Sequence, residues 1–198
     1  MKKAVALFLS AVMIICCFAG CSKTSAELTE ENITATADVV FTALKEFDTD
    51  ELEKYVSSST LSTIMRFAND HAQFGDLGRA IFANLTYEIT AIDIQAQTVT
   101  VSVLNKDLMQ AASDFTNELM SEYSTFQLLN NLTNDTWLDE NLSDLTGRID
   151  SAPMMSEAQE ITITITQGED NLIFGFDETA ENGVSGGALG AIKSAVGF

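Results

Sequence analysis

The single histidine of this 198-residue chain, His71, lies among acidic residues. Asp70 precedes it directly and Asp76 follows in the same segment. A histidine–aspartate pair could act as a proton shuttle, because imidazole gains and loses its proton near neutral pH. No nucleophile or second base accompanies the pair, and the run from Asn69 to His71 is also typical of a helix end, where histidine interacts favourably with the helix dipole. We therefore predict a capping or surface role for His71 and keep acid–base chemistry with Asp70 or Asp76 as the alternative.

A row of carboxylates is the second group that could do chemistry. Its members recur at helical spacing, so they share one stretch of a predicted helix: Asp135, Asp139, Glu140 and Asp144. Calcium binds carboxylate oxygens, but it needs six or more ligands wrapped around it, which one straight helix rarely supplies. A solvated acidic face is the main interpretation. We expect no metal site and no cofactor.

Aromatic side chains could line a pocket for an apolar ligand. The candidates are Tyr55, Phe67, Phe82, Tyr87, Trp137 and Phe176. Phe67 and Phe74 have the spacing of neighbours on a helix face, so ordinary core packing is the main interpretation for this group. A ligand pocket remains the alternative.

The N-terminal residues have the pattern of a targeting signal. Lys2 and Lys3 precede an apolar run, residues 4–18, which is shorter than the roughly 20 residues that span a bilayer. The run ends in Phe-Ala-Gly followed by Cys21, which resembles the bacterial lipobox. This resemblance implies a signal peptide over residues 1–20, a lipid on Cys21 and a short tether over residues 21–26. An ordinary signal peptide is the alternative.

The charge of the chain limits its partners. Ten Lys and Arg stand against 29 Asp and Glu, which gives a formal net charge of −19. Such a chain offers little to a phosphate backbone, so we expect no nucleic acid partner. An acidic body is also repelled from an anionic leaflet, so we expect membrane contact through the lipid alone, at the extracytoplasmic face of the cell membrane.

Helical patterns occur before and after residues 85–103 of the chain. One face is predicted by Ile33, Ala37, Val40, Leu44 and Phe47. Asp48 with Glu51 predicts a capping box, and the serines around Ser58 predict a further helix start. Gly75 and Gly78 predict a turn. Two longer stripes, over residues 108–126 and 138–149, predict helices within an insertion at residues 107–152.

Strand patterns occur in two places. Residues 85–94 alternate with a phase shift near Ala91 and Ile92, which predicts a β-bulge, and residues 99–103 alternate cleanly. Residues 161–165 and 172–176 predict a hairpin around a Gly-containing turn. We therefore predict an α+β fold, with N-terminal helices on a curved antiparallel sheet of about four strands and a helical insertion between two hairpins. Residues 27–180 form the predicted domain, and residues 181–198 a Gly/Ala-rich tail that packs on it or stays free.

A family resemblance accompanies this pattern. Residues 41–48, followed by Leu52 and Tyr55, resemble the paired-helix opening of nuclear-transport-factor-2-like domains, which bacterial lipoproteins often carry. Residues 161–177, followed by the Gly/Ala-rich run at 186–190, are similar to the ending of such lipoproteins. The resemblance covers residues 30–180 and implies a cone-shaped pocket between sheet and helices. Members of the family include enzymes, binding proteins and dimerisation modules, so the fold alone does not decide function.

These observations lead to one expected function and two alternatives. We expect a lipid-anchored, non-enzymatic binding or interaction module, which takes an apolar small molecule in the pocket or an envelope protein on the sheet. One alternative is a pocket enzyme that uses His71 with a nearby aspartate. The other is an envelope structural protein or homodimer that pairs through the sheet.

Overall fold

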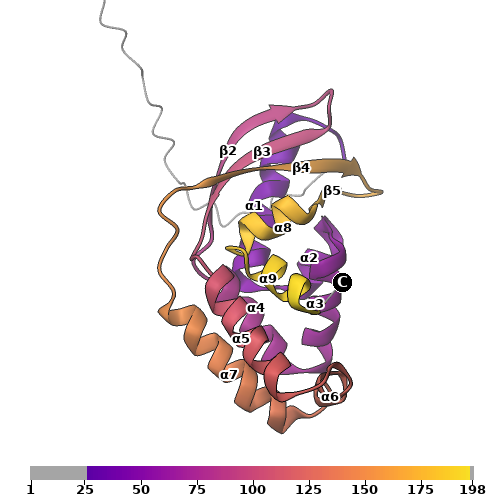
Figure 1. Ribbon diagram of the computed structural model, residues 1–198. Coiled ribbons are helices and arrows are strands. Elements are labelled where there is room, and N and C mark those ends of the chain that lie inside the picture. Colours follow the sequence, from indigo (N-terminus) through magenta and orange to yellow (C-terminus); the bar gives the residue numbers. More distant parts are fainter. Residues whose placement is uncertain (1–25, 197–198) are drawn as a thin grey trace, which may run out of the picture.

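The computed structural model describes residues 26–196, so the predicted signal peptide, Cys21 and most of the tether lie outside the described residues. Within that range the chain forms an α+β fold, as predicted (Figure 1). The elements follow in the order α1 (Glu30–Glu46), α2 (Thr49–Tyr55), β1 (Val56–Ser57), α3 (Ser59–Asp70), α4 (Ala72–Phe82), β2 (Thr86–Asp93), β3 (Thr98–Leu104), α5 (Met109–Glu122), α6 (Thr125–Asn131), α7 (Asp135–Ser151), β4 (Gln159–Gln167), β5 (Leu172–Gly175), α8 (Glu178–Val184) and α9 (Ala188–Val196).

Within residues 26–196, the sheet has five strands in the order β1-β5-β4-β3-β2. Strands β2 to β5 are the four predicted antiparallel strands, and the two-residue β1 adds a parallel edge next to β5. The predicted bulge is present as a register shift between Ile89 and Ala91. Because side chains alternate along a strand, the valines of β3 and the isoleucines of β4 share one buried face.

Helices cover that buried face, and the opposite face is polar. Tyr87 pairs directly with Val103, and its ring stacks on Phe41 of α1 at 4.0 Å between centroids. Gly183 of α8 sits so close to the same face that a Cβ there would lie 2.5 Å from Ile161. The other face presents threonine, serine and glutamate, namely Thr98, Thr100, Ser102, Glu160, Thr162 and Thr164. Leu104 and Ile173, both half-buried, add apolar side chains to this face, which offers little of the continuous apolar surface on which a sheet-paired dimer would rely.

The predicted turn at Gly75 and Gly78 is wrong, since both glycines lie inside α4. At position 78 the glycine serves a tertiary contact that the sequence pattern does not contain. Phe47 ends α1 in the left-handed region (φ 51°), and its buried ring lies against the backbone of Gly78. A Cβ at Gly78 would lie 2.5 Å from that ring, so the helix needs glycine here for close packing and not for a turn.

Residues 181–194, which the sequence predicts as part of a tail, pack on the domain. Val184, Ala188 and Leu189 are buried in the core. Gly186 has φ +60°, and a Cβ there would collide with the carbonyl oxygen of Lys106. The boundary placed at residue 180 therefore does not separate domain from tail, because α8 and α9 complete the core.

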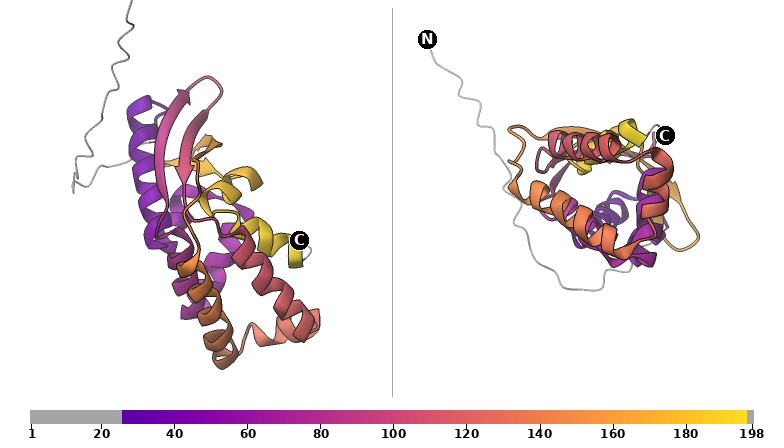
Figure 2. Two further views of the ribbon diagram at one scale, coloured as in Figure 1. Left: turned by 60° about the vertical axis from the view of Figure 1, so that its left-hand side comes forward. Right: turned by 60° about the horizontal axis from the view of Figure 1, so that its bottom comes forward.

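Three helices form an arm at the end of the molecule away from the sheet. These are α5, α6 and α7, the insertion predicted between the two hairpins (Figure 1). Viewed from that end, α5 and α7 lie on opposite sides with α6 joining them (Figure 2). Among the described residues, no helix combines the length and the apolar character needed to cross a bilayer.

Candidate functional site

His71 joins two parts of the helical layer. It ends α3 and begins α4, as the sequence predicted for a helix terminus. Its Nδ1 lies 2.8 Å from Oδ1 of Asp135, the first residue of α7, and its side chain is 17% exposed. The predicted pairing with Asp70 or Asp76 is not the one formed, since Asp76 instead accepts a hydrogen bond from Arg79. The partner of His71 comes from 64 residues away, a distance that local patterns do not reach.

The acidic row on α7 also takes part in contacts that hold the arm. Asp139 accepts a hydrogen bond of 2.6 Å from the Gln73 amide of α4, next to the pair formed by His71 and Asp135. Asp144 accepts from Arg148 one turn further along α7. Among the described residues, no three His, Cys, Asp or Glu side chains converge as metal ligands. Two of the four carboxylates, Asp135 and Asp139, therefore fasten α7 to the start of α4.

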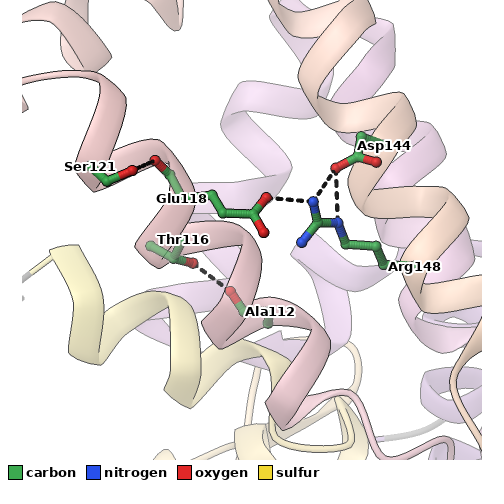
Figure 3. A network of polar contacts seen from close by, with 6 residues as sticks. All are labelled: Ala112, Thr116, Glu118, Ser121, Asp144 and Arg148. Atoms are coloured by element: carbon green, nitrogen blue, oxygen red, sulfur yellow. Dashed lines mark hydrogen bonds and ion pairs between the residues drawn. The ribbon is translucent and has the colours of Figure 1, made fainter.

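An arginine network links α5 to α7 (Figure 3). The Arg148 guanidinium donates to Oδ2 of Asp144 at 2.8 Å and to Oε2 of Glu118 on α5 at 2.5 Å. The same guanidinium lies 5.8 Å from the ring centre of Phe115. The bond from Arg148 lowers the pKa of the Glu118 carboxyl below its ordinary range, and the carboxylate raises the pKa of the guanidinium in turn. The network keeps the two long helices of the arm together.

The six aromatic candidates occupy separate packing contacts. Phe82 and Phe176 are buried in the core, and Phe82 stacks on Phe47 at 6.1 Å. Three other candidates each contact an aromatic ring outside the set: Tyr87 stacks on Phe41, Phe67 lies 5.3 Å from Phe74, and Trp137 lies edge-on to Tyr123 at 5.7 Å between ring centroids. Tyr55 packs at the margin of the core.

The cavities that adjoin the arm are lined by other residues. One of about 420 Å³ lies between α5 and the C-terminal helices, with Met109, Asn182 and Gly190 in its wall. Another of about 440 Å³ lies between α5 and the end of α7. A third, of about 310 Å³, lies between α5 and α7 and has Glu122 and Glu140 in its wall. None of the six predicted aromatic residues lines these three cavities.

Exposed apolar side chains mark the tip of the arm. Helix α6 has no buried residue, and two of its large apolar side chains are exposed, Phe126 at 73% and Leu129 at 54%. They stand three residues apart, so they lie on one face of the helix. The prediction that Phe126 continues the buried stripe of the preceding helix is wrong, because the chain turns at Ser124 and starts a new helix there. The Ser124–Gln127 capping box was the local signal that could have shown this.

The arm as a whole carries an excess of negative charge. Residues 109–151 contain one basic residue, Arg148, which is already paired with Glu118 and Asp144. The acidic residues of this segment are Asp114, Glu118, Glu122, Asp135, Asp139, Glu140, Asp144 and Asp150. The arm therefore combines an exposed apolar pair with a strongly acidic surround.

Comparisons of the chain with known protein families, with curated proteins and with solved structures found no match. The resemblance to nuclear-transport-factor-2-like domains thus stays a prediction.

Proposed function

We propose that this chain is a lipid-anchored protein of the bacterial cell envelope that acts by binding another protein, without catalysis of its own. The lipobox-like end of the apolar run supports anchoring through Cys21 at the extracytoplasmic face. A non-enzymatic role is supported by the position of the one histidine–aspartate pair, because neither His71 nor Asp135 lies in the wall of the three cavities described above.

The exposed apolar face of α6 is the observation that carries the binding proposal. Helix α6 is seven residues long, contains no buried residue and exposes Phe126 and Leu129 to solvent. Apolar side chains that are exposed next to one another, and not singly, mark interaction sites on protein surfaces. The sheet is the weaker choice for a partner, since its outer face is lined by threonine, serine and glutamate.

Anchoring is tested by metabolic labelling with an alkyne-tagged fatty acid in a bacterial host. The wild-type chain should carry the label and sediment with membranes, and the Cys21→Ala variant should lose the label. A wild-type chain without label would refute the anchor and favour the ordinary signal peptide.

Protein binding is tested in the same cells by placing a photo-crosslinking residue at position 129. A crosslinked band is expected there and not at position 94, because Ile94 is also exposed (40%) but lies in the β2–β3 turn, away from the arm. Equal crosslinking at both positions, or none at position 129, would contradict the proposal.

A further inference from the structure

The strongest unassigned feature of the arm is the combination of the apolar α6 face with an acid-lined cavity beside it. Phe126 and Leu129 form the α6 face. The cavity of about 310 Å³ begins directly before this helix, since Glu122 and Tyr123 in its wall precede the Ser124 cap. The two features are therefore neighbours along the chain and at the same end of the arm.

The cavity has the lining of a receptor for a cationic side chain. Its wall contains four carboxylates, from Glu118, Glu122, Glu140 and Asp144, together with apolar surface from Phe115, Leu119 and Tyr123. Arg148 already neutralises two of them, Glu118 and Asp144. Glu122 and Glu140 form no hydrogen bond or ion pair within the described part of the chain. Lysine and arginine join an apolar stem to a charged end, which matches this lining.

We infer that the tip of the arm docks a cationic amphipathic segment of a partner protein. Its apolar side chains cover Phe126 and Leu129, and a Lys or Arg side chain enters the cavity between Glu122 and Glu140. This inference rests on the proposed binding function and names the chemistry of the partner. Charge complementarity decides the occupant, because an arm with a single, already paired basic residue attracts a basic partner.

The same charge argues against the other occupants of the α6 face. A second copy of this chain would bring an identical acidic arm against the first, and like charges at such contact are repulsive. An anionic lipid surface is repelled for the same reason. A basic amphipathic helix supplies both an apolar face that can cover Phe126 and Leu129 and the positive charge that the arm lacks.

The experiment uses the full chain purified in a neutral detergent and a fluorescein-labelled synthetic peptide of Leu and Lys at helical spacing. Fluorescence anisotropy measures binding, and protein-free micelles correct for partition of the peptide. Wild type should bind, and binding should weaken with added salt. The Phe126→Ser/Leu129→Ser variant should bind about tenfold or more weakly, because each lost contact removes apolar burial. Ile94→Ser is the matched control and should bind as wild type does.

The charge contribution has its own variant and its own control peptide. Glu122→Gln/Glu140→Gln should weaken binding and flatten its salt dependence, and a peptide with Glu in place of Lys should not bind. Equal binding of both peptides, or wild-type affinity in the α6 variant, would overturn the inference. Self-association of wild type that the α6 variant abolishes would also overturn it and make a second copy the occupant. Crosslinking at position 129 in cells without binding of the Lys peptide would leave the proposed function standing and reject only this partner chemistry.

Discussion

Two glycines in helix interiors provide a paired test of the packing described above. Gly78 lies in α4 under the Phe47 ring, and Gly147 lies in α7 with nothing within 4 Å of a Cβ placed on it. Replacing glycine by alanine in a helix stabilises it by roughly 0.5–1 kcal/mol where there is room. We therefore expect Gly147→Ala to raise the free energy of unfolding by about that amount.

Gly78→Ala should have the opposite sign. The added Cβ would lie 2.5 Å from three atoms of the Phe47 ring, more than 1 Å closer than carbon atoms pack without repulsion. That ring is buried and stacks on Phe82, so it has little room to move away. Overpacking of this kind costs about 1–3 kcal/mol. After the gain in helix propensity is subtracted, a net loss of roughly 1–2 kcal/mol is expected.

The measurement is urea unfolding of the two variants and wild type, followed by far-ultraviolet circular dichroism and by emission of the single tryptophan, Trp137. The two variants should differ by about 2–3 kcal/mol, with wild type between them, and their melting temperatures by roughly 4–12 °C. If both substitutions stabilise the chain, the close packing of Phe47 on α4 is refuted. If both destabilise it equally, the open surface at Gly147 is refuted.

Three further substitutions test contacts that the sequence did not reveal. Asn105→Ala should lower the free energy of unfolding by about 3 kcal/mol, since the buried amide donates to the last turns of α4 and α8 and accepts from the next backbone N–H. Hydrogen exchange of the backbone amides should also become faster over residues 178–196. The role would be contradicted if Asn105→Ala lowered the free energy of unfolding no more than the exposed control Asn130→Ala does. Burial and a hydrogen bond to a carboxylate of α1 raise the pKa of the Tyr87 phenol above its ordinary value of 10.0. As the pH rises above that value, the unfolded chain therefore releases the phenol proton before the folded chain does, and the free energy of unfolding falls. Urea unfolding at about pH 8 and about pH 11 should show a smaller fall for Tyr87→Phe than for wild type, and an equal fall would argue against the buried phenol. Glu181→Ala should lower the free energy of unfolding by roughly 2–3 kcal/mol, because the buried carboxylate accepts hydrogen bonds from Thr60 and from the Ser58 hydroxyl at the start of α3. An unchanged melting temperature would show that this contact does not hold α8 to α3.

The arm gives the fold a division of labour. Helices α5 and α7 of the insertion contribute buried side chains to the core, such as Phe115 and Leu138, whereas α6 contributes none and exposes Phe126 and Leu129. Polar pairs hold the insertion in place at two levels, through His71 with Asp135 near the tip and through Arg148 with Glu118 between its long helices. For the proposed docking of a partner, such contacts would hold α6 in a fixed position and so reduce the entropy lost in ordering the helix on binding.

The sequence alone determined the elements whose signals are local. The apolar face of α1, the caps at Asp48 and Ser58, the alternation in β3 and β4 and the helical insertion all follow from residues within a few positions of one another. The lipobox-like motif at Cys21 is local too, and it remains a prediction from the sequence. Such patterns are readable because helix and strand periods fix which neighbours share a face.

Only the tertiary structure decided which elements meet. The partner of His71 lies 64 residues away, and the contacts of Glu181 with Ser58 and Thr60 join α8 to the start of α3, more than 120 residues earlier. Glycine is required at position 78 because the ring of Phe47 occupies the space of a side chain there. The two-residue β1 is a strand only because β5 lies beside it. The exposure of Phe126 likewise depends on where the chain turns. These features carry no local period, since they arise from packing between segments whose separation along the chain is set by the fold.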